Sequence, residues 1–186
     1  MPESILTVWF DYTCPHSYRE LAQLESLADR QALKIDRRPF LTRPDAVERS
    51  PRQQTPSISA DGRREPLYRP GESLGTEPAS NRSLSTLLAH AATLYAKELG
   101  LDGHFFWAAS HYYWERGADL GSLYTVREIA LAVGLDWADL SAKLESGVYH
   151  HKVLTRYAEA VAAGVTEVPT FMLDGGLQTN YIPTQE

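Results

Sequence analysis

Cysteine is almost absent from this sequence: Cys14 is the single cysteine among 186 residues. One cysteine cannot form a disulfide within the chain, and cysteine-poor proteins without disulfides are typical of a reducing compartment. The first residues also lack a basic segment followed by a long apolar one, so no signal peptide is evident. From these two absences we expect a cytoplasmic protein.

Long apolar runs, excess positive charge and several common catalytic motifs are missing as well. No stretch reaches the ~20 apolar residues of a membrane helix, so we expect no membrane partner. The formal net charge of −6 disfavours a nucleic-acid partner. The sequence contains no phosphate-binding glycine loop, no Gly-x-Ser-x-Gly and no zinc-finger spacing. His150 and His151 are adjacent and therefore face different sides of a helix, so we expect no metal site.

What is present suffices for a folded core, because 43% of the residues are hydrophobic. Residues 5–10 are β-branched and aromatic, which predicts a buried strand. Apolar residues at helical spacing predict an amphipathic helix over 15–30, and residues 33–40 resemble a second strand. A strand, a helix and a strand in this order indicate a parallel βαβ unit over residues 1–40.

The rest of the chain differs in character from this first unit. Six of the eleven prolines fall within residues 41–82, which predicts a loop or arm. Residues 83–164 follow as a series of helices, one of which would begin at a capping box formed by Thr125 and Glu128. Residues 165–186 predict a strand and a hairpin. The predicted class is therefore α/β, with a helical insertion between a βαβ half and a ββ half.

The chemistry is expected at Cys14, where the first predicted strand gives way to the first predicted helix. A thiolate at a helix N-terminus is stabilised by the helix dipole and by unpaired backbone N–H groups. His16 can add positive charge, and the Ser17 hydroxyl can donate a hydrogen bond to sulfur. Pro15 suits the first helical position, where its missing N–H costs nothing. A lone cysteine is more often a small buried hydrophobe, but this context favours a nucleophile.

Two segments on either side of the helical region resemble one protein family. Residues 10–17 resemble the active-site segment of DsbA-like thioredoxin-fold proteins, especially their FrnE-like cytoplasmic branch. Residues 163–171 look like the cis-proline loop and third strand of that branch. The family is related to 2-hydroxychromene-2-carboxylate isomerases and kappa-class glutathione transferases. The resemblance implies a thioredoxin-like fold that carries a helical insertion.

The resemblance also implies roles for individual residues. Cys14 would be the nucleophile, with His16 and Ser17 completing the catalytic group. A cis bond before Pro169 would turn the N–H and C=O of Val168 outward, where they can pair with an extended peptide. Pro15, Val168 and Pro169 are therefore the expected substrate-binding residues.

Three departures from the family pattern limit what the resemblance implies. Redox members carry Cys-x-x-Cys, whereas the second position here is Ser17, so no internal thiol can resolve a mixed disulfide. The glutathione-dependent relatives usually carry serine where Cys14 stands. The family normally ends with a helix, and residues 182–186 are too short for one.

Three functional hypotheses remain open. The first is a thiol–disulfide oxidoreductase or isomerase with a monothiol site, whose Cys14 forms mixed disulfides with a protein or a low-molecular-weight thiol. It requires no cofactor, and glutathione is a candidate co-substrate. The second is a glutathione-dependent isomerase or transferase that acts on a small aromatic molecule. The third is a redox-inactive thioredoxin-fold binding protein.

The closing strand also suggests an oligomeric state. Val168, Phe171, Met172 and Leu173 give it apolar residues on both faces, and such a strand needs a cover on each face. The cover could be the arm over residues 41–80, a second copy of the chain, or a helix absent from this sequence. We expect a homodimer, because two-fold association is the commonest oligomeric solution.

Overall fold

The structure is a computed structural model that describes four stretches of the chain: residues 5–31, 33–44, 85–173 and 176–179. The expected proline-rich arm falls almost entirely outside the described residues. Residues 182–186, which were expected to be too short for a C-terminal helix, also lie outside them. The chain divides into two compact units. The first unit falls within residues 1–42 and 155–186, and the second within residues 43–154.

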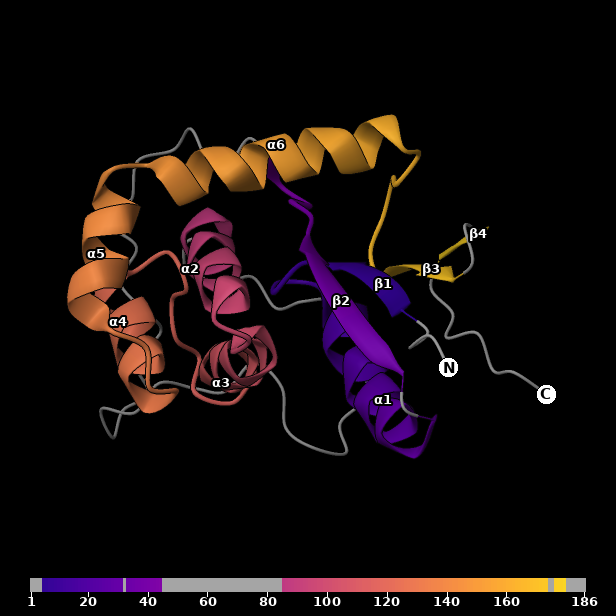
Figure 1. Cartoon of the computed structure of the whole chain (residues 1–186), viewed down its shortest axis with the longest axis horizontal. Helices are drawn as coiled ribbons and strands as arrows, with labels where there is room; N and C mark the ends of the chain where they lie inside the picture. The colour runs from indigo at the N-terminus through magenta and orange to yellow at the C-terminus, as the bar shows by residue number, and fades with distance from the viewer. Residues whose placement is uncertain (1–4, 32, 45–84, 174–175, 180–186) are drawn as a thin grey trace. The chain divides into compact units, whose positions relative to one another are not determined.

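The first unit is built on a four-stranded sheet with the strand order β2-β1-β3-β4 (Figure 1). The strands are β1 (Ile5–Phe10), β2 (Lys34–Pro39), β3 (Thr170–Leu173) and β4 (Gly176–Thr179). β1 pairs with β2 in parallel, while the pairs β1–β3 and β3–β4 are antiparallel. Helix α1 (Pro15–Gln31) is the crossover that parallel neighbours require. The predicted α/β class and the βαβ unit are confirmed.

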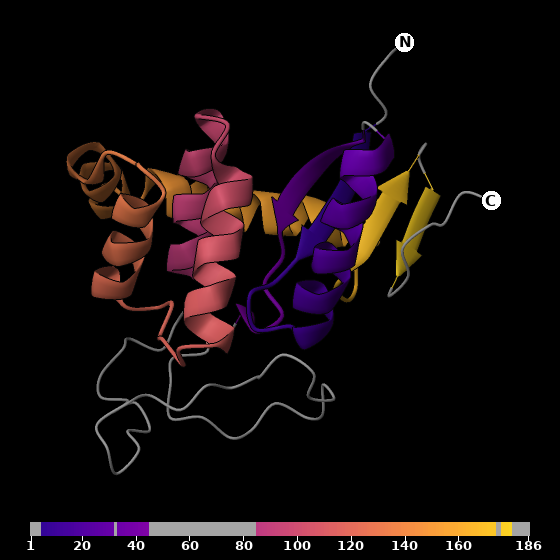
Figure 2. The ribbon, with the colours of Figure 1, turned by 90° about the horizontal axis from the view of Figure 1, so that it is seen from below.

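Strand pairing decides which residues share a face of the sheet. Trp9 pairs with Thr170, and Thr7 pairs with Met172, so these side chains point to one face. That face carries a hydrophobic cluster. The cluster comprises Trp9, Phe40, Ala160, Val165 and Val168, with Cys14, Tyr157 and Met172 packed against it. Tyr157 and Ala160 belong to the last part of α6 (Val148–Ala162), which lies behind the sheet in Figure 2. Part of one face of β3 is therefore covered by a helix of the chain itself.

The second unit is helical. It holds α2 (Leu87–Glu98), α3 (Asp102–Trp114), α4 (Leu123–Ala132), α5 (Trp137–Glu145) and the first part of α6. Helix α2 packs against α3, α4 and α5. Four buried alanines on α2 permit this close approach: Ala89, Ala91, Ala92 and Ala96. The predicted series of helices is confirmed.

The start of α4 differs from the prediction. The residue that precedes the helix is Ser122, in an extended conformation, and Thr125 lies inside α4 with its side chain buried. The predicted capping box at Thr125 is therefore wrong, because Leu123 and Tyr124 are already helical. Asp136 does cap α5, since its carboxylate accepts the backbone N–H groups of the second and third helical residues.

Two tyrosines join three helices of this unit. The Tyr95 hydroxyl on α2 donates to Asp139 on α5 at 2.8 Å, and the Tyr149 hydroxyl on α6 donates to Glu98 on α2 at 2.6 Å. The two rings meet edge to face, with centroids 5.7 Å apart. Each carboxylate therefore accepts a phenol from a neighbouring helix, which ties the helices together through hydrogen bonds as well as apolar packing.

These contacts shift the ionisation of the groups involved. Burial, and then the hydrogen bond to Asp139, raises the pKa of Tyr95 to about 12. Burial and the bond to Glu98 raise the pKa of Tyr149 in the same way. Hydrogen bonds from Lys152 and Tyr149 lower the pKa of Glu98. The folded unit therefore favours protonated phenols beside ionised carboxylates.

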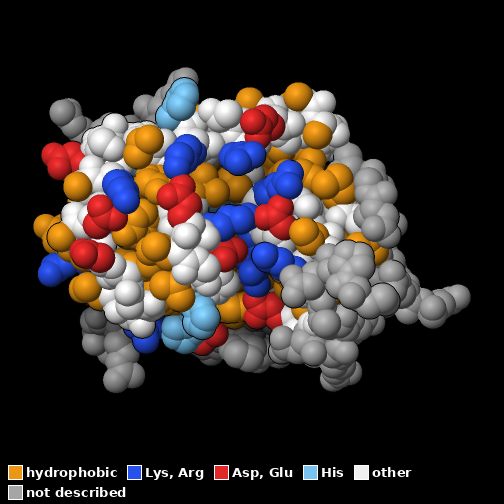
Figure 3. Space-filling model, in the orientation of Figure 1, with side chains coloured by type: hydrophobic (Ala, Val, Ile, Leu, Met, Phe, Trp, Pro, Cys, Tyr) orange, Lys and Arg blue, Asp and Glu red, His pale blue; other side chains and the backbone are white. Residues whose placement is uncertain are grey.

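Among the described residues, no helix is both long enough and apolar enough to span a bilayer. Across the same residues, no cluster of three or more His, Cys, Asp or Glu side chains could hold a metal ion. Figure 3 shows basic and acidic side chains intermixed on one face of the molecule.

Candidate active site

The sulfur of Cys14 caps helix α1. The Tyr18 N–H donates to the Cys14 carbonyl at 3.2 Å, so Cys14 immediately precedes the helix, and Pro15 is its first residue. The Ser17 backbone N–H donates to Cys14 Sγ at 3.4 Å. Sulfur thus takes the place that a serine or aspartate oxygen usually fills at a helix start. An anionic sulfur would gain there from the aligned peptide dipoles.

The same sulfur faces the loop before β3. The Cys14 thiol donates to the carbonyl oxygen of Val168 at 3.3 Å, and the Val168–Pro169 peptide bond is cis. The two segments meet because β3 pairs with β1, which ends just before Cys14. The structure therefore brings Cys14, Ser17 and Val168 into direct contact.

Asp11 fixes the loop that carries Cys14. Its carboxylate is buried, 2% exposed, and accepts two hydrogen bonds from Thr42, from the N–H at 2.8 Å and from the hydroxyl at 2.7 Å. Its backbone carbonyl accepts the Cys14 N–H at 3.1 Å. The Thr13 hydroxyl lies 3.4 Å from that of Thr42. Asp11 is thus a positioning residue that the sequence analysis missed. An aspartate in a turn was visible, but its partner 31 residues away was not.

Cys14 sits at the edge of an apolar environment. Its side chain is partly buried and packs against the cluster that contains Trp9, Phe40 and Val168. The guanidinium of Arg38 lies 5.4 Å from the centre of the Trp9 ring, within the range of a cation–π contact. The sulfur therefore has two polar contacts, with the Ser17 N–H and the Val168 carbonyl, and the rest of its surroundings include the apolar cluster.

The neighbours of Cys14 differ from their predicted positions in two respects. His16 is exposed and forms no hydrogen bond or ion pair with a described residue, so its charge can act on sulfur only through solvent. Ser17 is fully buried, and it reaches the sulfur through its backbone N–H. Its hydroxyl has no partner among the described residues. We expected the Ser17 hydroxyl to donate to Cys14 Sγ, but the Ser17 backbone N–H does so instead. Ser17 is the third residue of α1, and the N–H of the third helical residue points at the capping side chain.

The carbonyl of Val168 also departs from the expectation that it points outward. In this structure one of its two lone pairs accepts the Cys14 thiol, so while sulfur is protonated the carbonyl shares its oxygen between the thiol and any peptide donor. A thiolate or a disulfide sulfur has no proton to donate. The hydrogen bond to Val168 therefore forms only in the thiol. The Ser17 N–H, in contrast, can donate to sulfur in the thiol, the thiolate and the disulfide.

Comparisons with known proteins agree with this architecture. A family model described as the DSBA-like thioredoxin domain matches residues 5–183. A probable DsbA oxidoreductase from Streptomyces coelicolor is 23% identical with a TM-score of 0.69, over 95% of this chain and 83% of that chain. A 2-hydroxychromene-2-carboxylate isomerase is 14% identical with a TM-score of 0.68, over 94% of this chain and 88% of that chain.

A further similar structure is the cytosolic disulfide reductase DsbM from Pseudomonas aeruginosa. It is 16% identical with a TM-score of 0.64, over 94% of this chain and 87% of that chain, and it has also been solved with GSH. No curated protein matches the sequence. These likenesses confirm the thioredoxin-like fold that the sequence predicted.

Proposed function

Because this chain belongs to the DSBA-like thioredoxin domain family, we propose that it is a thiol–disulfide oxidoreductase or isomerase that works through one cysteine, Cys14. The observation that carries the proposal is the position of Cys14 Sγ, which receives the Ser17 N–H at the start of α1 and lies 3.3 Å from the Val168 carbonyl. A helix N-terminus favours the thiolate, the form of cysteine that attacks disulfides.

The proposed reaction is exchange between a thiolate and a disulfide. The Cys14 thiolate attacks one sulfur of a substrate disulfide, so that a Cys14–substrate bond forms, the substrate S–S bond breaks and the second substrate sulfur leaves as a thiolate. The 186 residues contain no second cysteine to attack the adduct. An external thiol, such as glutathione, therefore has to attack the mixed disulfide and restore Cys14. No bound cofactor takes part.

Substrate binding would use the loop before β3. In a mixed disulfide, sulfur no longer donates to Val168, and a backbone N–H of an extended peptide can take the place of the thiol at the Val168 carbonyl. Pro169 and Pro15 lie next to the two partners of that contact in sequence and are the expected apolar contacts for the peptide. The proposed partners are a protein or glutathione disulfide in the cytoplasm.

Adduct formation tests this proposal directly. The reduced protein is incubated with glutathione disulfide, and intact-mass spectrometry should show one glutathionyl group per chain. Cys14→Ser should show none, and dithiothreitol should remove the adduct from the wild type. A wild-type protein that stays unmodified at neutral pH, while the unfolded chain reacts, would reject disulfide exchange and leave the glutathione-dependent isomerase and the redox-inactive binding protein as the functions.

A glutathione-dependent isomerase is the second candidate, because the chain shares its fold with a 2-hydroxychromene-2-carboxylate isomerase. In that case the sulfur of glutathione would replace Cys14 Sγ at the Ser17 N–H at the start of α1, and Cys14 would not become covalently attached. The two candidates separate in one assay. Turnover of a hydroxychromene carboxylate in the presence of glutathione that survives in Cys14→Ser favours the isomerase, whereas adduct formation without such turnover favours disulfide exchange.

A further inference from the structure

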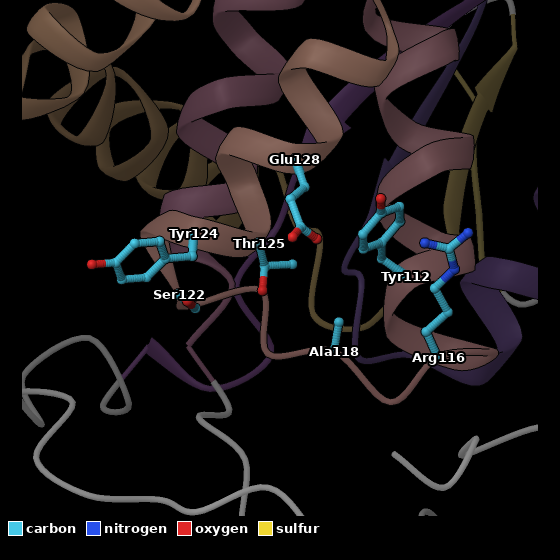
Figure 4. Close-up of a pocket in the computed structure, with 7 residues that line it drawn as sticks. All are labelled: Tyr112, Arg116, Ala118, Ser122, Tyr124, Thr125 and Glu128. Atoms are coloured by element: carbon cyan, nitrogen blue, oxygen red, sulfur yellow. The ribbon is translucent and has the colours of Figure 1, made fainter. Parts of the chain in front are cut away.

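A polar pocket of about 480 Å³ lies in the helical unit, between the end of α3 and the start of α4 (Figure 4). Its volume falls in the range of small-molecule sites. Most of the residues that line it carry polar groups: Tyr112, Arg116, Ser122, Tyr124, Thr125 and Glu128. None of these residues takes part in the proposed thiol chemistry, so that chemistry does not explain the pocket.

Opposite charges line this pocket without pairing. Neither Arg116 nor Glu128 forms an ion pair with another described residue. Lys143 and Asp139 in the same unit do pair, at 2.7 Å. The Arg116 guanidinium instead lies 4.4 Å from the centre of the Tyr112 ring. That stacking holds the guanidinium in place and leaves its N–H edge available for an anion.

The other side of the pocket is acidic and rich in hydroxyls. In Figure 4 the Glu128 carboxylate and the Tyr112 ring face each other across the pocket, and Thr125 lies beside the carboxylate. Thr125 is 6% exposed, and its hydroxyl forms no hydrogen bond with another described residue. Tyr124 is 81% exposed and points away from the other side chains. The pocket thus offers an acceptor for a cation, a ring face and a separate donor for an anion.

We propose that this pocket binds a small zwitterion of the α-amino acid class. The ligand's ammonium group binds Glu128, its carboxylate binds Arg116, and its side chain lies against the ring of Tyr112. Arg116 and Glu128 are both exposed to solvent, and a ligand with one charge would engage only one of them. A ligand with both charges satisfies each through a charge-assisted hydrogen bond. This site acts independently of Cys14.

Calorimetric titration of the full chain with L-phenylalanine tests the proposal. We expect saturable binding to one site per chain at millimolar ligand. Arg116→Met and Glu128→Gln should each weaken it by about tenfold or more, because each removes a charged hydrogen bond. Arg127→Met and Glu145→Gln are matched controls, since both residues are exposed and lie outside the pocket. These control variants should bind as the wild type does.

Two analogues test the same claim on the unaltered protein, so that it does not depend on the folding of a variant. N-acetyl-L-phenylalanine lacks the ammonium group, and L-phenylalaninamide lacks the carboxylate. Each should bind at least about tenfold more weakly than L-phenylalanine. Absence of saturable L-phenylalanine binding, equal binding of either analogue, or an unchanged affinity in either pocket variant would overturn the proposal.

Discussion

The Cys14 thiol donates a hydrogen bond to the carbonyl oxygen of Val168, 154 residues further along the chain, at 3.3 Å. This contact joins the start of α1 to the loop before β3, and it exists only while sulfur carries a proton. Proton loss or mixed-disulfide formation therefore ends this hydrogen bond. The proposed peptide acceptor thus has one lone pair engaged by the thiol in the resting protein and both available when sulfur reacts.

The reactivity of Cys14 is the first prediction. Cys14 should react with iodoacetamide at pH 7 faster than a free model thiol, because the helix N-terminus favours the thiolate. His16→Gln should slow the reaction less than about fivefold, since an exposed charge contributes at most about 1 kcal/mol. Arg19→Gln, one turn further along α1 and also exposed, is the control. A wild-type rate no greater than that of the model thiol would contradict the prediction.

Resolution of the mixed disulfide is the second prediction. Ser17→Cys should shorten the lifetime of the glutathione adduct by at least about tenfold, because it supplies an internal thiol beside the sulfur. Ser17→Ala should leave that lifetime unchanged. It should also keep the protein at least as stable, since the Ser17 hydroxyl is buried without a described partner. Release rates followed by intact-mass spectrometry decide the matter. Equal lifetimes in Ser17→Cys and wild type would show that side chain 17 cannot reach the sulfur.

The third prediction concerns Asp11. Asp11→Asn replaces a carboxylate oxygen that accepts two hydrogen bonds from Thr42 and should reduce the free energy of unfolding by about 1–3 kcal/mol. It should also slow adduct formation at Cys14, whose N–H binds the Asp11 carbonyl. The control Asp36→Asn weakens a half-exposed pair with Arg38 and should cost less than about 1 kcal/mol. Urea denaturation compares the two, and equal losses would refute the role of Asp11.

The fourth prediction concerns alkaline pH. Tyr95 has a raised pKa of about 12 in the folded unit, against an ordinary value of 10.0. Above pH 10 the unfolded chain loses this proton first, so the free energy of unfolding should fall as pH rises from 10 toward 12. Tyr95→Phe should flatten part of that fall, whereas Tyr124→Phe, whose ring is 81% exposed, should not. Urea denaturation at pH 8 to 11 measures both slopes, and identical slopes in Tyr95→Phe and wild type would contradict the assignment.

The fifth prediction concerns acidic pH and Glu98, which accepts the Tyr149 hydroxyl. Here the free energy of unfolding should fall as pH decreases. Lys152 and Tyr149 lower the pKa of Glu98, so its contribution to stability is present above the ordinary carboxyl pKa of 4.5 and is lost as pH falls through the lowered value. Glu98→Gln should therefore reduce the acid sensitivity of the helical unit. Thermal unfolding between pH 3 and 6 would show this, and an unchanged acid limb would rule it out.

The homodimer stays a prediction, but the structure weakens the argument that a second copy is needed to cover the closing strand. The sequence argument considered three covers for the apolar face of the closing strand and omitted a fourth. Tyr157 and Ala160 of α6 pack in the cluster that contains Trp9 and Met172, so the chain itself covers part of that face. Light scattering at roughly tens of micromolar, where association of about −6 to −7 kcal/mol would show, decides between one copy and two.

The local elements could be predicted because their signals are local. The strand expected over 5–10 matches β1, and the helix expected over 15–30 matches α1 within one residue. Position 14 was recognisable as the helix start because Pro15 follows it. The sequence did not show the bond between Asp11 and Thr42 or the donation from Cys14 to Val168, because both join residues that meet only once the strands have paired.

The buried hydroxyl of Ser17 bears on how position 17 can change during evolution. Serine and cysteine codons can differ by a single base, and the two side chains are similar in size. At most buried serines such an exchange would break a hydrogen bond, but the Ser17 hydroxyl has none with the described residues. The hydrogen bond to Cys14 Sγ comes from the Ser17 backbone N–H, which every residue except proline has. The proposed monothiol site and a dithiol site are therefore one mutation apart, in either direction.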